Sequence, residues 1–260
     1  NDEWLIASTT NNIEWTVNGN IGNIKILFNT DGSTNFPSPD TAYPTGNLLD
    51  TVNADTITSW NWNQIPDDPT TTGKIKLLQT TAVNGAPVLD SILAGNFTIK
   101  PTLTVVKPVI DAMFVVGRDH VVQWTTSPSV DTVNLLYHNG VSYVTPPGVT
   151  NPVTGTTCTV PICGNTTDKY YTWTLAAATV QNQNAKVKVE WPANPSAVND
   201  IGPNDPDIFT IVAGVTLTAP TGSSVPRVGQ DTDVSWTHPV GTCGLGGLCN
   251  VRIKYTTAWT

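Results

Sequence analysis

The sequence predicts an all-β protein built from repeated two-sheet sandwiches, two of them nearly complete and a third in part. Three observations predict this. Segments recur at a fixed interval, apolar residues alternate with a period of two, and clusters of Pro, Gly and Asn separate the alternating segments. A period of two is the pattern of a half-buried strand, and short strands with turn residues between them are typical of a sandwich.

The repeat is the strongest of these observations. Four matched pairs lie 112 positions apart: Phe97 with Phe209, Pro108 with Pro220, Gly117 with Gly229, and Trp124 with Trp236. This interval is too long for a solenoid repeat and corresponds to one small domain. We therefore predict modules at residues 1–101 and 102–213, and a partial module at 214–260.

The first predicted module begins part-way through its pattern. Trp4 lies 11 residues before Trp15, and Met113 lies 11 residues before Trp124. The first module therefore starts after the strand whose counterpart carries Pro108. Because an orphaned strand leaves backbone donors and acceptors unpaired, we expect a fragment of a longer array, with the first strand of module one missing.

The strands are predicted in the same order in each module. The first contains Trp15, Trp124 or Trp236, and the second has its apolar residues at 24–28, 133–137 or 251–255. The later ones contain Trp62 or Trp173, then residues 74–77 or 186–189, and finally 97–99 or 209–211. About four residues separate the last strand of one module from the first of the next, so we expect a semi-rigid rod.

Five tryptophans are predicted to lie in the cores: Trp15, Trp62, Trp124, Trp173 and Trp236. They share a face with inward apolar residues or recur at equivalent sites, and a buried indole removes a large area from water. The alternative is a platform of exposed aromatic rings that stacks on sugars. Trp4, Trp60 and Trp259, near strand or fragment ends, are the open candidates for it.

A resemblance is carried by the order of these motifs. Phe-Thr-Ile, then Val or Leu with Pro three positions later, then Gly, Trp and an alternating Val-x-Leu-x-Tyr segment, resembles the Ig-like or fibronectin-III-like modules of large bacterial and archaeal cell-surface proteins. It is also similar to the Ig-like domain of yeast cell-wall β-glucan assembly proteins. The resemblance covers essentially the whole chain and implies tandem antiparallel Ig-like β-sandwiches with a spacer, surface-layer or adhesive role. Such motifs specify a fold better than an activity.

The four cysteines form two close pairs, Cys158 with Cys163 and Cys243 with Cys249. We predict a structural disulfide in each pair, which for loops this short contributes about 2 kcal/mol. Disulfides indicate an oxidising compartment, so we expect an extracellular or cell-surface location. A zinc site of four thiolates is the sharper alternative, but neither pair has zinc-knuckle spacing; free thiols are the other alternative.

Composition argues against two classes of partner. Only 12% of residues are charged, the net charge is −8, and Lys and Arg are scattered singly. We therefore expect no nucleic-acid partner. The chain has no run of 18 apolar residues, so we expect no membrane insertion within this segment.

Loop residues supply the candidate ligand sites. Acidic residues near module ends are candidates for calcium: Asp67, Asp68, Asp200, Asp205 and Asp207. They lack the spacing of a calcium loop, so solvated turns are the simpler interpretation and no cofactor is predicted. Asn165 and Asn96 each begin an Asn-x-Thr tripeptide and are candidate glycan acceptors.

No catalytic residues are predicted. His120, His138 and His238 occupy non-equivalent positions, and the common nucleophile, zinc-hydrolase and phosphate-loop motifs are absent. We therefore predict no enzyme but a structural repeat segment of a large extracellular protein, such as a surface layer, sheath, stalk or filament, with neighbouring copies or modules as partners. The alternative is an adhesin or a carbohydrate-binding accessory module whose partner is cell-surface polysaccharide. A third hypothesis places a catalytic domain outside this segment.

Overall fold

A computed structural model describes residues 2–82, 88–93, 95–159, 163, 168–176, 179, 182–195, 199–202, 208–221, 229, 231–237 and 253–254. All regular elements among them are strands, as the sequence predicted. The chain divides into two compact units. The first is Asn1–Thr102 with Thr126–Asp131 and Ala193–Val198, and the second is Leu103–Thr125, Thr132–Pro192 and Asn199–Thr260. The predicted third module, at 214–260, belongs to the second unit in this division and stays a prediction.

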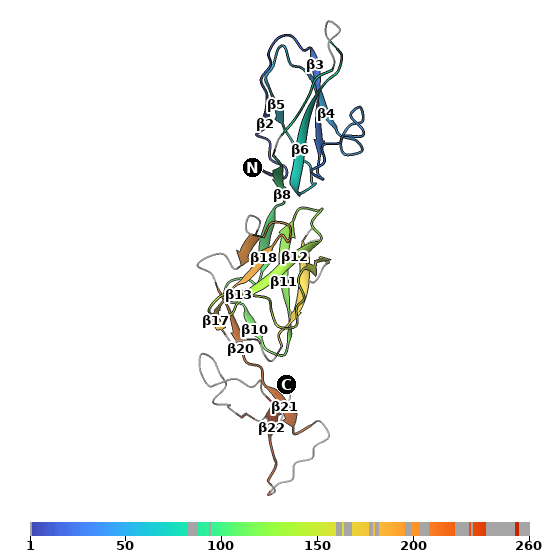
Figure 1. Cartoon of the computed structure of the whole chain (residues 1–260). Coiled ribbons are helices and arrows are strands. Elements are labelled where there is room, and N and C mark those ends of the chain that lie inside the picture. The colour runs from blue at the N-terminus through green and yellow to red at the C-terminus, as the bar shows by residue number, and fades with distance from the viewer. Residues whose placement is uncertain are drawn as a thin grey trace. The chain divides into compact units, whose positions relative to one another are not determined.

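The first unit contains two sheets. The larger joins, in order, β1 (Glu3–Leu5), β8 (Phe97–Lys100), β6 (Thr70–Gln79), β3 (Asn23–Asn29) and β4 (Leu48–Asn53), with β7 (Asp90–Ile92) also paired to β6. β1 runs parallel to β8, and the remaining pairs are antiparallel. The smaller sheet pairs β2 (Asn11–Glu14) with β5 (Ser59–Trp62). Figure 1 shows β2 and β5 on one side of this unit and β3, β4 and β6 on the other.

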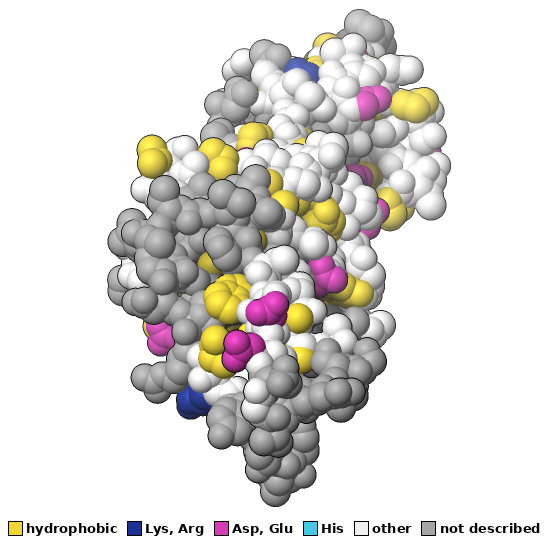
Figure 2. All heavy atoms as spheres, turned by 90° about the horizontal axis from the view of Figure 1, so that it is seen from below, with side chains coloured by type: hydrophobic (Ala, Val, Ile, Leu, Met, Phe, Trp, Pro, Cys, Tyr) yellow, Lys and Arg dark blue, Asp and Glu magenta, His cyan; other side chains and the backbone are white. Residues whose placement is uncertain are grey.

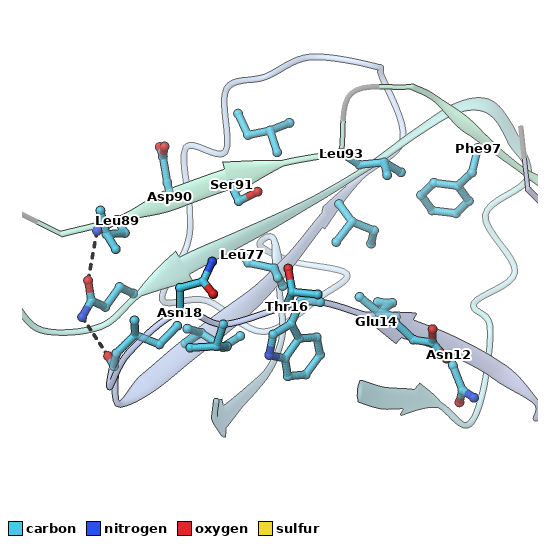
Figure 3. Close-up of a pocket in the computed structure, with 18 of the residues that line it drawn as sticks. Asn12, Glu14, Thr16, Asn18, Leu77, Leu89, Asp90, Ser91, Leu93 and Phe97 are labelled. Atoms are coloured by element: carbon cyan, nitrogen blue, oxygen red, sulfur yellow. Dashed lines mark hydrogen bonds between the residues drawn. The ribbon is translucent and has the colours of Figure 1, made fainter. Parts of the chain in front are cut away.

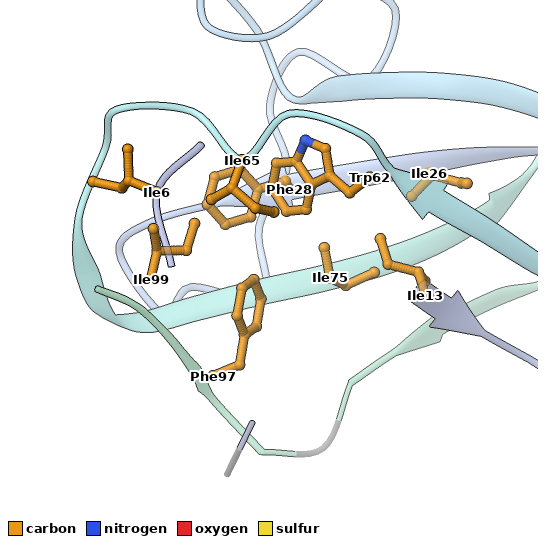
Figure 4. Close-up of a cluster of buried hydrophobic side chains, with 9 residues drawn as sticks. All are labelled: Ile6, Ile13, Ile26, Phe28, Trp62, Ile65, Ile75, Phe97 and Ile99. Atoms are coloured by element: carbon orange, nitrogen blue, oxygen red, sulfur yellow. The ribbon is translucent and has the colours of Figure 1, made fainter. Parts of the chain in front are cut away.

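The core of the first unit fills the space between its sheets. Its buried side chains are Ile6, Ile13, Ile26, Phe28, Trp62, Ile65, Ile75, Phe97 and Ile99. Figure 4 shows the indole of Trp62 beside the ring of Phe28, and their centroids lie 4.9 Å apart in an edge-on arrangement, which aromatic pairs prefer. The period-two alternation of β3 places Ile26 and Phe28 on this face, as predicted.

Within the described residues, the second unit contains four sheets. One orders β15 (Thr156–Thr157), β16 (Lys169–Thr174), β11 (Asp119–Thr126) and β9 (Leu103–Lys107). Another orders β13 (Tyr143–Val144), β12 (Thr132–His138), β18 (Val187–Glu190) and β19 (Asn199–Gly202), with β14 (Val153–Thr154) on β12. The third orders β10 (Met113–Val115), β20 (Phe209–Val212) and β17 (Asn182–Ala185). β21 (Thr216–Ala219) pairs with β22 (Ser235–Thr237) in a separate two-stranded sheet.

The sequence repeat appears in space as equivalent strands. β1 runs parallel to β8 and β10 runs parallel to β20, and β8 and β20 are equivalent strands of the repeat. The pairs β3 with β6 and β12 with β18 are both antiparallel and central to their sheets. Gly117 and Gly229 both take positive φ, 84° and 77°, which glycine adopts without strain. The predicted class, tandem antiparallel Ig-like β-sandwiches, is therefore confirmed.

Candidate functional site

A groove of about 810 Å³ lies on the first unit, between β2 and β7. One bank is formed by residues 12–18 and the other by residues 89–93, while Ile24, Ile75 and Leu77 lie beneath them. Figure 3 shows Leu89, Asp90, Ser91 and Leu93 along one bank and Asn12, Glu14, Thr16 and Asn18 along the opposite one. The volume falls within the range of sites that bind small molecules or peptide segments.

Gln79 connects the two banks at one end of the groove. Its side-chain Nε2 donates to the Ile21 carbonyl at 2.7 Å, and its Oε1 accepts from the Leu89 amide at 3.1 Å (dashed in Figure 3). Gln79 is buried, and both hydrogen bonds are made within the unit. Both polar atoms of the buried Gln79 amide group are therefore hydrogen-bonded, which favours a fixed groove width at this end.

The bank formed by β7 carries apolar side chains that nothing covers in the described part of the chain. Leu89 is 56% exposed and Leu93 is 44% exposed. They face the groove because Leu77 lies opposite Ser91 in the β6–β7 pair and the Leu93 amide donates to the Ile75 carbonyl. A single exposed leucine is ordinary, whereas two that line one groove indicate an interaction surface.

The second unit fills the equivalent place with one of its own strands. There β9 lies beside β11, and Val105 of β9 is only 9% exposed. A Cβ added at Gly202 of β19 would lie 2.7 Å from Val105 Cβ, and the Val105 amide donates to Asp200 Oδ2 at 2.7 Å. β9 therefore covers β19 and pairs with the edge of β11.

The pairing registers show which residues correspond. Asp200 lies opposite Val189 in the second unit, as Ser91 lies opposite Leu77 in the first. Two residues further along, Gly202 lies opposite Val187, and Leu93 bonds to Ile75 at the equivalent place, so Leu93 is the counterpart of Gly202. Among the described residues of the first unit, β2 is hydrogen-bonded to β5 alone. The groove is therefore the place of a strand like β9.

Trp15 and Trp124 are equivalent in the repeat but differ in solvent exposure. Trp124 is 1% exposed, whereas Trp15 is half-buried and lines the groove. Trp15 still packs against the core of the first unit. Trp15 directly follows β2, and the open groove leaves its side chain partly in contact with solvent, although Trp15 and Trp124 are equivalent in the repeat.

The other predicted core tryptophans divide into two groups. Trp62 is 5% exposed and Trp173 is 1% exposed, so both lie in cores. Trp236 is 37% exposed, and the prediction of a core position is wrong for it. In the part of the chain that the structure describes, its strand β22 pairs only with β21, so no second sheet covers the indole. Trp4 and Trp60 pack against the first core as half-buried residues, and Trp259 lies outside the described residues.

One predicted disulfide is described. Cys158 and Cys163 are joined, and Cys158 is buried. The Cys158 amide donates to the Asp168 carbonyl at 2.8 Å, and Gln123 Nε2 donates to the Asp168 carboxylate at 2.6 Å, so the bond is attached to a buried polar pair. Cys243 and Cys249 lie outside the described residues.

The candidate glycan acceptors are placed unequally. Asn96 is half-buried and directly precedes β8, whose Thr98 is buried. A glycan on Asn96 would need the tripeptide to leave the strand, so this position is poorly suited to be an acceptor. Asn165 lies outside the described residues.

The loop acids have protein partners. Asp67 accepts from the amide and hydroxyl of Ser129, and Asp200 accepts from the Val105 amide. Asp68 accepts from the Tyr43 hydroxyl, and burial together with this hydrogen bond raises the pKa of Tyr43. No group of three His, Cys, Asp or Glu side chains suited to a metal ion occurs within the described residues. Asp205 and Asp207 lie outside them, and calcium binding stays a prediction.

The described histidines contact backbone groups. The His120 ring stacks on Phe114 at 4.2 Å, and its Nε2 accepts from the Val115 amide at 2.8 Å. Burial lowers the pKa of His120 below its ordinary value, which favours the neutral ring. His138 Nδ1 accepts from the Gly140 amide at 3.2 Å. These contacts orient loops and strand ends, and His238 lies outside the described residues.

The molecular surface is weakly charged. On the face shown in Figure 2, the lysine and arginine side chains lie apart from one another, and hydrophobic side chains are interspersed with acidic ones. Within the described ranges, no helix is long and apolar enough to cross a membrane.

Comparisons with known proteins found similar chains among solved structures only. No protein-family model matches the chain, and no curated protein matches it. Solved structures that match include fibronectin(III)-like modules of Clostridium thermocellum CbhA, with 13% identity over 81% of this chain and 87% of that chain, at a TM-score of 0.23. The titin I-band fragment I67-I69 matches with 9% identity over 81% of this chain and 62% of that chain, at a TM-score of 0.30. Rst D1-D2 matches with 10% identity over 81% of this chain and 95% of that chain, at a TM-score of 0.34. The chain thus resembles tandem Ig-like and fibronectin-III-like modules, and the assignment of the fold itself rests on the strand order described above.

Proposed function

We propose that this chain is a structural repeat segment of a large extracellular surface protein, in which it acts as a spacer or assembly unit. The observation that carries the proposal is the burial of most of the described tryptophan side chains. Among the described tryptophans, Trp236 alone is exposed, while Trp62, Trp124, Trp173 and Trp191 are buried. Aromatic rings placed in this way stabilise sandwiches and leave little surface for stacking on a ligand.

The chemistry of the described cysteines supports the proposed location. The Cys158–Cys163 disulfide persists in an oxidising compartment, which supports an extracytoplasmic protein. Two sandwiches in tandem, joined by a short connection between β8 and β9, suit a role in spacing. A row of exposed aromatic rings would favour the carbohydrate-binding alternative, and the described surface offers one exposed indole, that of Trp236.

Two measurements on the whole chain test the proposal. In single-molecule stretching, a spacer should give separate unfolding events, each releasing about 30–35 nm for a unit of roughly 100 residues. A glycan array should show no specific binding. Extension without resisting events would contradict the spacer role. Specific glycan binding that is lost in Trp236→Ala would support the carbohydrate-binding alternative instead.

A further inference from the structure

We propose that Asn139 is a self-modification site: its side-chain amide cyclises with the backbone nitrogen of Gly140 and releases ammonia, with His138 as the base. The site lies in the turn between β12 and β13 of the second unit. The inference goes beyond the proposed function and does not depend on it, because a spacer needs no chemical change in a turn.

The side chain of Asn139 folds forward over Gly140. Its Oδ1 accepts from the Val141 amide at 2.9 Å and from the Ser142 amide at 3.0 Å. The Asn139 amide donates to the Ser142 carbonyl at 3.1 Å, which closes the turn. A side chain held in this way brings its Cγ toward the Gly140 nitrogen, and two donors on Oδ1 draw electron density away from Cγ. The side-chain carbonyl is therefore positioned and activated for attack.

The Gly140 nitrogen is the nucleophile, and a base already contacts its proton. The Gly140 amide donates to His138 Nδ1 at 3.2 Å, which is within the range for a base and the proton that it removes. Because Nδ1 accepts this bond, the proton of the neutral imidazole is on Nε2, and Nδ1 can take another. Gly140 has φ 99° and no Cβ, so no side chain of its own obstructs the approach of Asn139.

Two neighbours hold His138 in this orientation. Its ring packs edge-on against Tyr143, with the ring centroids 5.1 Å apart. The His138 carbonyl accepts from Asn182 Nδ2 at 2.9 Å, and Asn182 is buried. The base is therefore held beside the nucleophile and the electrophile before they react, which favours an intramolecular step.

The reaction follows from these contacts. As the Gly140 nitrogen bonds to Asn139 Cγ, its proton passes to His138 Nδ1. The negative charge that develops on Oδ1 is stabilised by the Val141 and Ser142 amides. The bond from Cγ to the side-chain nitrogen then breaks, and that nitrogen takes the proton from His138 and leaves as ammonia. The product is a cyclic succinimide, and water opens it at either carbonyl to give aspartate or isoaspartate.

The same chain contains a matched dipeptide for comparison. Asn18-Gly19 also has its glycine at positive φ, 89°. The three histidines of the chain are at positions 120, 138 and 238, and none of them belongs to the first unit. Asn18-Gly19 therefore has the nucleophile and the electrophile without an imidazole base in its unit. Asn84-Gly85 lies outside the described residues.

Peptide mapping by mass spectrometry tests the proposal on the whole folded chain, incubated at neutral pH. The succinimide is detected by the loss of one ammonia, and chromatography separates the aspartate and isoaspartate peptides. Because a positioned base contributes about 10²–10⁴-fold, Asn139 should react about a hundredfold faster than Asn18. His138→Gln keeps an acceptor near Gly140 but takes up no proton. It should slow the reaction at Asn139 about a hundredfold and leave that at Asn18 unchanged.

Unfolding separates the effect of the turn from that of the dipeptide. In urea the hydrogen bonds of the turn are lost, so Asn139 should react more slowly than in the folded chain and at a rate similar to that of Asn18. Asn139→Asp supplies the reference for the aspartate product. Circular dichroism shows that each variant is folded.

Three results would each overturn the proposal. They are a reaction at Asn139 no faster than at Asn18 in the folded chain, an unchanged rate in His138→Gln, and a faster reaction of Asn139 after unfolding. The last result would mean that the turn protects Asn139 by holding it still. The comparison of folded with unfolded chain uses the unaltered protein, so it tests the proposal without any variant. None of these results bears on the spacer role.

Discussion

Gly117→Ala and Ala7→Gly test whether two equivalent turns of the repeat both adopt a left-handed backbone conformation. The turn after β10 places Gly117 at φ 84°, and the turn after β1 places Ala7 at φ 62°. The two residues occupy equivalent positions, since each follows its strand by the same number of residues. An L-residue with a side chain pays roughly 1–2 kcal/mol in this left-handed region.

The magnitudes follow from the surroundings of each residue. A Cβ at Gly117 would meet no atom within 4 Å, so Gly117→Ala carries no steric clash. Its backbone cost is offset by about 0.4–1 kcal/mol because alanine reduces the freedom of the unfolded chain. We therefore expect Gly117→Ala to lower the free energy of unfolding of the second unit by about 1 kcal/mol. Ala7→Gly should raise that of the first unit by a similar amount.

Differential scanning calorimetry measures both effects. A change of 1 kcal/mol should move the melting temperature of a unit of this size by about 4–8 °C. Ala82→Gly is the control, because Ala82 is exposed and is not among the residues with positive φ; it should destabilise the first unit slightly. If Ala7→Gly destabilised the first unit as Ala82→Gly does, the turn would not have the conformation described.

Three further predictions concern the second unit. Trp124→Ala should lower the free energy of unfolding, measured in urea, by about 3–5 kcal/mol because Trp124 is 1% exposed. Trp236→Ala should lower it by less than about 1 kcal/mol because Trp236 is 37% exposed. Cys158→Ala with Cys163→Ala should cost about 2 kcal/mol by the chain-entropy estimate, and an unchanged melting temperature would contradict it. Burial lowers the pKa of His120, so the unfolded chain takes up the proton first as pH falls below about 6.5, and the free energy of unfolding should decrease there. His120→Asn should make the free energy of unfolding depend less on pH in this range. Solvent screening of the part-exposed ring keeps the effect small.

The sequence predicted the fold through its repeat and its alternation. Constant offsets paired β8 with β20 and β6 with β18, and parity placed Ile26, Phe28 and Trp124 in cores. β7 was not predicted, because Asp90, Ser91 and Ile92 show no alternation of apolar and polar residues. It forms where β6 is long enough to pair with a second segment besides β8.

The candidate site was predicted only in part. The sequence predicted the strands that contain Ile13 and Ile75, but not that the surface between β2 and β7 forms a groove. That surface depends on Leu89 and Leu93, which lie in a segment without a strand pattern and became recognisable only from their pairing with β6. The core position predicted for Trp236 was wrong for a related reason. The period-two alternation shows which face of a strand a side chain lies on, but it does not show whether another sheet covers that face.

The same limit explains why equivalent tryptophans differ in exposure. Trp15, Trp124 and Trp236 have the same sequence environment, yet Trp124 is buried, Trp15 half-buried and Trp236 exposed. Their burial follows the number of strands placed around each one: β9 flanks the strand of Trp124, an open groove borders Trp15, and a lone hairpin carries Trp236.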